Sequence, residues 1–236
     1  RKGTAPLMPH AAAGRHSRRI ARYGGGMSFV DIPVPHGRLE ALFWQEPSPR
    51  FAAVMCHPHP LHGGTMHNHV TYRAAQALRD AGGSVLRFNF RGVGRSTGTH
   101  DFGAGELDDA RAALEYVAQA QPGVPLVLGG FSFGCRTALE LALQEPRVTR
   151  VLAVGLAVDT FDVGFVAKLE TRTAFVHSEH DEFGAVASLE ALRAKISSAE
   201  TKLFVVPGAD HLCTGKLDAL SATLGPAVAW LLETPR

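Results

Sequence analysis

The sequence predicts an α/β protein in which helices cover both faces of a mostly parallel sheet. From residue 27 onward, short runs rich in β-branched and aromatic residues alternate with longer segments of helical periodicity. Gly, Pro or Asp residues mark the junctions between these segments. The length of 236 residues, with 45% hydrophobic and 19% charged residues, suits one globular domain with a sizeable buried core.

This alternation predicts an eight-stranded sheet. The strands are expected at residues 28–34, 38–44, 51–56, 84–89, 125–129, 149–154, 173–178 and 202–206. Only three residues separate the first two strands, so this pair is expected to form an antiparallel hairpin at one edge of the sheet.

Five helices are predicted, each beginning after a loop that follows the carboxyl end of a strand. They are expected at residues 68–81, 105–120, 133–144, 184–197 and 216–233. Open α/β sheets bind ligands at the carboxyl ends of their strands, so we expect the functional site there. Fewer than 20 residues separate the strand ending near Val154 from the strand starting near Thr173, which is too few for a large cap domain.

The first 26 residues differ in charge from the rest of the chain. They include six basic residues and no acidic residue, in a protein whose formal net charge is +2. We expect residues 1–26 to be a disordered or non-native extension and residues 27–236 to form the functional domain. The basic residues lack interleaved aromatic residues and a periodic apolar face, so neither nucleic acid nor a membrane is an expected partner.

The pattern of apolar residues and cysteines suggests a cytoplasmic protein. No run approaches the roughly 18 consecutive apolar residues that span a bilayer, and no long apolar stretch follows the basic residues at the N-terminus. Cys56, Cys135 and Cys213 are odd in number and widely spaced, which favours free thiols over a disulfide framework or a metal motif. Both a monomer and a homodimer are compatible with the sequence.

The strongest chemical signal is Gly-Phe-Ser-Phe-Gly at residues 130–134, directly after a predicted strand and directly before a predicted helix. A turn of this kind holds its central residue, Ser132, in a strained conformation that exposes the hydroxyl above the sheet. The helix N-terminus also points free N–H groups at the site, which favours developing negative charge. A glycine-rich turn with a capping serine is the structural alternative.

A serine hydroxyl is a weak nucleophile, so it needs a histidine as general base and a carboxylate to orient that histidine. His211 is the best-placed histidine, because it lies in the loop between the last predicted strand and the last predicted helix. Asp181 follows the penultimate strand and is the favoured acid. Five other acidic residues in the neighbouring loops remain open as alternatives: Asp159, Asp162, Glu179, Glu182 and Asp210.

Acyl transfer also requires N–H donors for an oxyanion. The N–H of Phe133, which follows the serine, is one candidate donor. The loop after the strand at 51–56 offers the other, and His59 is favoured because Pro58 and Pro60 have no N–H group. His57 is expected beneath this loop as a structural hydrogen-bonding residue.

The same loop raises a competing idea, a metal site, because five histidines lie between residues 57 and 69. They are His57, His59, His62, His67 and His69. No H-E-x-x-H motif or comparable carboxylate-bearing signature accompanies them, so no functional metal is expected.

Six motifs together resemble those of a known family. They are HPHP at 57–60, GGTM at 63–66, FNFRGVGRS at 88–96, GELDDA at 105–110, GFSFG at 130–134 and PGADH at 207–211. The combination resembles the small bacterial serine hydrolases of the α/β-hydrolase superfamily that are similar to dienelactone hydrolases and lack a cap. The resemblance implies the α/β-hydrolase fold, esterase activity on small acyl esters, a triad of Ser132, Asp181 and His211, and no cofactor.

The sequence departs from the family at several positions, which concern substrate preference. True dienelactone hydrolases use a cysteine nucleophile, whereas residue 132 is serine, so that specialised lactone cleavage is disfavoured. His67 and His69 stand where acidic or basic residues are expected, and Cys135 stands where a small residue is usual. Cys213 follows closely after the base.

Four residues near these motifs are candidates for lining the substrate pocket: His57, Arg91, Arg95 and Phe131. For the two arginines, a salt bridge that braces the loop is the structural alternative. The favoured hypothesis is a serine carboxylesterase that hydrolyses small, short-acyl esters. A thioesterase, a peptidase-like hydrolase and a non-catalytic binding module on the same fold are the alternatives.

Overall fold

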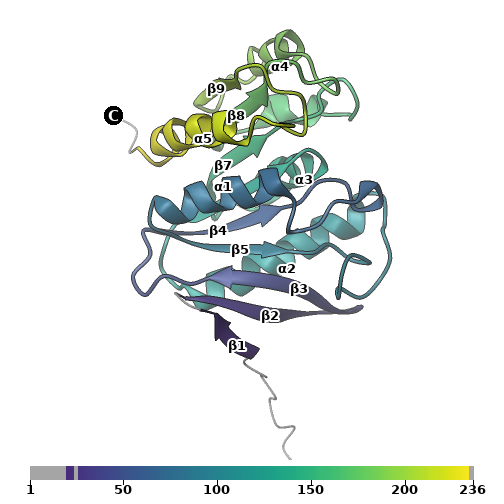
Figure 1. The fold of residues 1–236 in the computed structure, drawn as a ribbon, viewed down its shortest axis with the longest axis vertical. Helices are drawn as coiled ribbons and strands as arrows, with labels where there is room; N and C mark the ends of the chain where they lie inside the picture. The colour runs from purple at the N-terminus through teal and green to yellow at the C-terminus, as the bar shows by residue number, and fades with distance from the viewer. Residues whose placement is uncertain (1–19, 24–25, 234–236) are drawn as a thin grey trace, which may run out of the picture.

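The computed structural model describes residues 20–23 and 26–233, and their nine strands form one sheet (Figure 1). The strands are β1 (Ile20–Tyr23), β2 (Met27–Val34), β3 (Gly37–Trp44), β4 (Phe51–Cys56), β5 (Gly83–Phe88), β6 (Leu126–Phe131), β7 (Val148–Val154), β8 (Arg172–Ser178) and β9 (Thr201–Val206). Their spatial order is β1-β2-β3-β5-β4-β6-β7-β8-β9.

The sheet is mostly parallel, which confirms the predicted fold class. β5, β4, β6, β7, β8 and β9 pair in parallel, whereas β1, β2 and β3 pair antiparallel at one edge. β2 and β3 form the predicted hairpin, with Val34 paired to Gly37 across the turn. The ninth strand, β1, was not predicted; its four residues lie within the segment 1–26 and are too few to show a strand periodicity.

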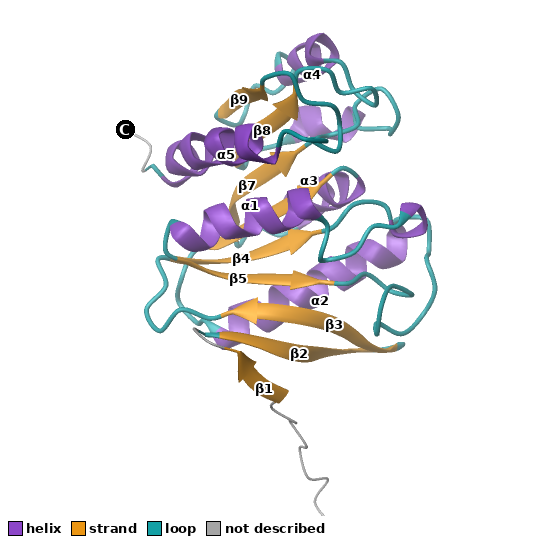
Figure 2. Ribbon diagram, viewed as in Figure 1, coloured by secondary structure: helices purple, strands orange, loops and turns teal. Residues whose placement is uncertain are grey.

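Helices cover both faces of the sheet, as Figure 2 shows. They are α1 (His69–Asp80), α2 (Ala104–Ala120), α3 (Phe133–Gln144), α4 (Val186–Arg193) and α5 (Leu217–Leu232). α1 and α5 pack on one face and share a core with the side chains of Phe51, Met55 and Val127. α2, α3 and α4 pack on the other face around Phe88, Leu128 and Phe175.

The central strands are buried because both of their sides are covered. β4 and β6 consist of apolar residues and glycine, whereas β5 also contains Ser84 and Arg87. All six residues of β4, Phe-Ala-Ala-Val-Met-Cys, are buried, and the same holds for β5 and β6. This core fixes the positions at which the loops leave the carboxyl ends of the strands. Those loops carry the candidate site.

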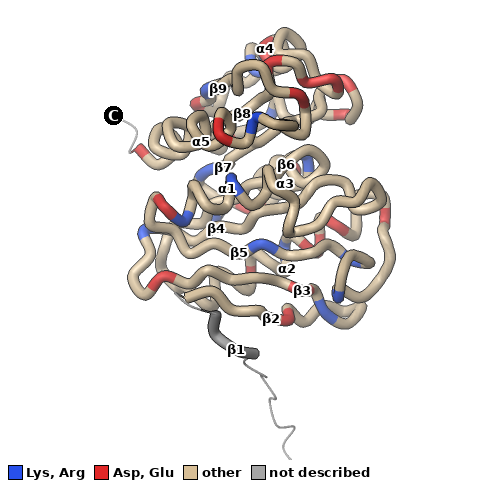
Figure 3. Tube along the Cα trace, in the orientation of Figure 1, with Lys and Arg blue, Asp and Glu red and all other residues tan. Residues whose placement is uncertain are grey.

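No cap domain interrupts the fold in the described part of the chain. The segment between β7 and β8 contains a single short 3₁₀ helix, η2 (Gly164–Lys168). Basic and acidic residues are interspersed over the trace in Figure 3 and do not separate onto opposite ends of the fold. None of the helices in residues 26–233 combines the length and apolarity that a transmembrane span requires.

Candidate active site

The candidate site lies at the carboxyl edge of the sheet, where the loops after β4, β6, β8 and β9 meet. β4 lies between β5 and β6, so the chain leaves β4 toward one side of the sheet and later returns to β6 on its other side. Loops diverge at such a reversal of strand order and leave room for a ligand. Ser132 follows β6 directly at this point.

Ser132 occupies a sharp turn between β6 and α3. Its φ of 56° and ψ of −117° are unusual for a residue with a side chain, and its N–H donates to the carbonyl of Val154 over 3.0 Å. A side chain on Gly130 would overlap the backbone of Gly134, and one on Gly134 would overlap the backbone of the loop after β4. Both glycines are therefore required for the close packing that presents the Ser132 hydroxyl.

A continuous chain of hydrogen bonds joins Ser132, His211 and Asp181. The Nε2 atom of His211 lies 3.0 Å from Ser132 Oγ. Its Nδ1 atom lies 2.9 Å and 2.8 Å from the two carboxylate oxygens of Asp181. The three residues are 8%, 5% and 7% exposed, so their polar groups interact where water is largely excluded. Such a chain can pass a proton from the hydroxyl to the imidazole.

Aromatic rings hold His211 in this orientation. The Phe131 ring lies 5.0 Å from the imidazole, centroid to centroid, and the Phe183 ring meets it edge-on at 4.9 Å. Phe183 N–H also donates to Asp181 Oδ1 over 3.0 Å, so one loop positions both the acid and a wall of the base.

The five alternative acids have other partners. Asp159 accepts from Ala185 N–H, Asp162 from Gly164 N–H, Glu179 from Gly208 N–H, Glu182 from His211 N–H and Asp210 from Thr214 N–H. The bond from Ala185 lowers the pKa of the Asp159 carboxyl, and the bond from Thr214 lowers that of Asp210. Among the acidic residues in the part of the chain that the structure describes, Asp181 alone lies within hydrogen-bond distance of a ring nitrogen of His211, the Nδ1 atom.

The N–H groups of Phe133 and His59 are the two candidate oxyanion donors. Phe133 is the first residue of α3, where an N–H has no acceptor within the helix. His59 precedes the 3₁₀ helix η1 (Pro60–His62), and no acceptor for its N–H occurs among residues 26–233. The His59 carbonyl accepts from His62 and Gly64, which fixes the orientation of this peptide.

His57 supports the same loop from beneath. Its Nδ1 donates to the Pro58 carbonyl over 2.6 Å, and its Nε2 accepts from Phe90 N–H over 3.0 Å, so the imidazole is neutral. Burial lowers the pKa of His57 from 6.5 to about 4. Sequence reasoning anticipated this structural position, but it also offered His57 and Phe131 as pocket-lining residues. Both side chains are buried, at 0% and 1% exposed, so they support the site and do not line it.

Arg91 and Arg95 differ in their surroundings. Arg91 Nη2 and Nε lie 2.8 Å and 3.0 Å from the two carboxylate oxygens of Asp109, which is fully buried. This pair braces the loop after β5 against α2, and the Asp109 bond raises the pKa of Arg91. Arg95 is half-exposed and lies 3.9 Å from Asp31. In the described residues, neither arginine forms a hydrogen bond or an ion pair with Ser132 or His211.

Sequence reasoning missed two groups that shape the site. The buried carboxylate of Glu106 accepts from the N–H groups of Asp101 and Gly103 and lies 2.8 Å from His100 Nδ1. The spacing Gly-x-x-Glu at a helix start is a capping pattern and was visible in the sequence. His177, in β8, is also buried and donates from Nε2 to the Gly184 carbonyl over 2.6 Å, which holds the loop that carries Asp181. No short motif indicated this role.

The histidine-rich loop does not gather around a common point. The imidazoles of His59 and His62 stack at 4.4 Å, His57 is buried beneath them, and His67 and His69 are exposed. In residues 26–233, no three His, Cys, Asp or Glu side chains lie where they could hold one metal ion.

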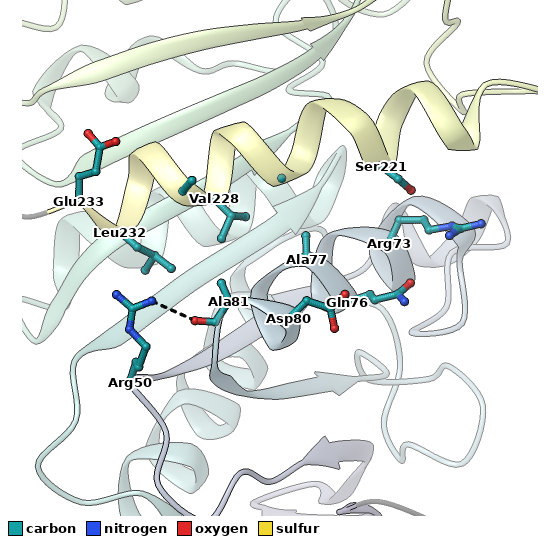
Figure 4. A pocket seen from close by; sticks show the side chains of 12 residues that line it. Arg50, Arg73, Gln76, Ala77, Asp80, Ala81, Ser221, Val228, Leu232 and Glu233 are labelled. Carbon is teal, nitrogen blue, oxygen red and sulfur yellow. Dashed lines mark hydrogen bonds between the residues drawn. The ribbon is translucent and has the colours of Figure 1, made fainter.

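A groove of about 650 Å³ lies elsewhere, between α1 and α5 (Figure 4). Arg50 and Asp80 lie on its α1 side, and Ser221, Val228 and Leu232 project from α5. None of its lining residues belongs to the loops that carry Ser132, Asp181 or His211. The groove is therefore separate from the candidate active site.

Comparison with known proteins gives the class to which this arrangement belongs. The family model for the alpha/beta hydrolase fold matches residues 61–163. An uncharacterized protein of Rickettsia prowazekii (strain Madrid E) is 34% identical over 200 residues, which cover 80% of this chain and 84% of that protein.

Two solved structures are similar over nearly their whole length. One is an alpha-beta serine hydrolase homologue from Coxiella burnetii, with 33% identity, a TM-score of 0.78, and coverage of 84% of this chain and 96% of that one. The other, XC6422 from Xanthomonas campestris, is a member of the α/β serine hydrolases without a lid; it has 30% identity, a TM-score of 0.79, and coverage of 92% and 100%. The chain belongs to the α/β-hydrolase family.

Proposed function

We propose that this protein is a serine carboxylesterase that hydrolyses small-molecule esters through an acyl-enzyme intermediate. The hydrogen-bonded chain from Ser132 through His211 to Asp181 carries this proposal, because it ends at a strained turn with two free N–H groups nearby. A serine, a base and an orienting acid in this order are the parts that acyl transfer requires.

In the acylation step, Ser132 Oγ attacks the ester carbonyl while its proton passes to His211 Nε2. Asp181 accepts a hydrogen bond from His211 Nδ1 and stabilises the imidazolium that forms. The N–H groups of Phe133 and His59 stabilise the oxyanion of the tetrahedral intermediate. His211 then gives its proton to the leaving alkoxide, and the alcohol departs.

In the deacylation step, His211 takes a proton from a water molecule, which attacks the acyl-enzyme. A second tetrahedral intermediate uses the same oxyanion donors, and its collapse returns the proton to Ser132 Oγ and releases the carboxylic acid. No cofactor takes part in either half of this proposed reaction.

The test measures hydrolysis of p-nitrophenyl acetate, butyrate and octanoate by the wild type, with fluorophosphonate labelling read by intact mass. We expect turnover of the short esters and one label, and loss of both in Ser132→Ala. The matched control Ser221→Ala removes a hydroxyl that bonds only to the Leu217 carbonyl of its own helix, so activity and labelling should remain. Asp181→Asn should keep the label site but lower kcat by about 10³–10⁴-fold.

Two outcomes would contradict the esterase proposal. Faster turnover of thioesters or peptides than of matched esters, with the same loss in Ser132→Ala, would make the protein a thioesterase or a peptidase. A wild type that neither labels nor turns over any of these substrates would leave a binding module on a hydrolase fold.

A further inference from the structure

Beside the candidate oxyanion donors lies a group of six rings, here called the ring cluster. Its members are His59, His62, His100, Phe102, Phe133 and Phe161. His59 lies 5.0 Å from Phe133 and 5.1 Å from His100, and Phe133 lies 6.3 Å from Phe161, centroid to centroid. The members come from four loops or helix starts that are far apart in the sequence.

The rings of the cluster differ in their exposure, and His62 and Phe102 are the exposed members. Phe133 is buried, His59, His100 and Phe161 are partly buried, and Phe102 is 89% exposed. A core cluster would bury its outermost ring, whereas this one leaves its outer ring open to solvent. The cluster is therefore a partly exposed aromatic surface next to the candidate oxyanion donors.

Phe102 is unfavourable for the fold in two respects. Its ring exposes a large apolar surface, and its one aromatic neighbour among the described residues is His100, which it meets edge-on at 5.3 Å. Its φ of 50° is also a conformation that residues with bulky side chains rarely adopt. The buried carboxylate of Glu106 fixes the segment that carries it, by accepting from Asp101 and Gly103 and contacting His100. The surrounding structure thus holds Phe102 in an exposed position that does not contribute to the core.

We propose that the ring cluster is the acyl subsite of this enzyme and that it binds an aromatic acyl group, with Phe102 as the ring that completes the contact. This inference rests on the proposed function. The substrate would be an arene carboxylate ester such as a benzoate, whose acyl group carries the aromatic ring. Stacked and edge-on contacts between rings favour an aromatic group over an aliphatic group of the same size.

The position of His211 assigns the subsite to the acyl side of the ester. His211 must protonate the leaving oxygen, so the alcohol group lies toward His211, where Phe183 and the exposed Leu212 stand. The carbonyl oxygen points at the N–H groups of His59 and Phe133. The remaining substituent of the carbonyl carbon, the acyl group, extends away from His211 and over the rings that adjoin these donors.

The experiment compares kcat/KM for p-nitrophenyl benzoate and p-nitrophenyl cyclohexanecarboxylate, which share a leaving group and nearly the same acyl size. The ratio of the two values is measured for the wild type and for Phe102→Leu, because comparing the ratios between proteins cancels the intrinsic reactivity of each ester. We expect Phe102→Leu to lower the ratio by about threefold to tenfold. Leu143→Ala removes another exposed apolar side chain, at the end of α3, and should leave the ratio unchanged.

A second pair, benzyl acetate and cyclohexylmethyl acetate, tests the alcohol side. An unchanged benzoate ratio in Phe102→Leu would overturn the inference. A change in the benzyl pair without a change in the benzoate pair would overturn the assignment to the acyl side.

Binding separates this inference from the proposed esterase mechanism. If the wild type hydrolyses no ester and takes no fluorophosphonate label, the esterase proposal fails. Calorimetric titration of benzamide and cyclohexanecarboxamide then still tests the ring cluster. Tighter binding of benzamide by the wild type, with the difference lost in Phe102→Leu, would support an aromatic subsite, and equal binding would refute it.

Discussion

His57 makes the stability of the site sensitive to acid. Its Nε2 accepts from Phe90 N–H and its Nδ1 donates to the Pro58 carbonyl, so the folded protein accommodates only the neutral ring. A proton on Nε2 would face the Phe90 N–H, donor against donor, in a fully buried position. Acidification should therefore weaken the packing between the loops after β4 and β5.

The size of this effect follows from the pKa of His57, which burial lowers from 6.5 to about 4. Above pH 6.5 the ring is neutral in both the folded and the unfolded chain, and it has no effect. Between pH 6.5 and 4 the unfolded chain binds the proton first, so the free energy of unfolding falls as the pH falls. The total loss is about 3 kcal/mol, of which about 2 kcal/mol is lost by pH 5. Below pH 4 this contribution changes no further.

Urea denaturation between pH 7.5 and 4 measures this dependence in the wild type and in His57→Gln, whose amide can both accept and donate but does not titrate. Other groups titrate in both proteins, so the difference between their pH profiles isolates His57. We expect the variant to be less stable at pH 7.5 but to lose about 3 kcal/mol less on acidification. His67→Gln, at an exposed position, should follow the wild type. Parallel profiles for the wild type and His57→Gln would refute the reasoning.

Two further substitutions test the supports of the site. Arg91→Met leaves the buried Asp109 carboxylate unpaired and should lower the free energy of unfolding by about 3 kcal/mol in urea, whereas Arg95→Met, at a half-exposed pair, should change it by less than about 1 kcal/mol. Gly134→Ala would overlap the backbone of the loop after β4 and should cost more than about 4 kcal/mol and abolish fluorophosphonate labelling. Gly164→Ala, at an exposed position where an added Cβ would meet Asp162 Oδ1 at an ordinary 3.5 Å, should change the free energy of unfolding by less than about 1 kcal/mol. A labelled, stable Gly134→Ala protein or a neutral Arg91→Met would contradict these accounts.

Local sequence signals were sufficient to predict most of the fold. The β-branched and aromatic runs predicted β2 to β9 to within about two residues, because these strands are rich in such residues and Gly, Pro or Asp mark the junctions between elements. β1 could not be predicted, since Ile-Ala-Arg-Tyr is too short for a periodicity and its pairing with β2 depends on distant contacts. The predicted helix at 184–197 is shorter in the structure, where α4 ends at Arg193.

The candidate site was predictable where a motif carries its own geometry. The glycines around Ser132 and the strand-end positions of Asp181 and His211 suffice to bring these residues together, and their hydrogen bonds have the expected order. Their chemical roles stay predictions. The ring cluster was not predictable, because the meeting of His100 with His59 and Phe133 depends on the path of a loop between β5 and α2 that has no periodic pattern.

The conformation of Ser132 lowers the stability of the fold but presents the hydroxyl that the proposed chemistry needs. A side chain at a φ of 56° and a ψ of −117° costs of order 1–3 kcal/mol, which glycine would avoid. A chain that no longer needed the hydroxyl would therefore gain stability by replacing it with glycine. The serine at this position is consistent with a site retained for its reactivity at the expense of stability.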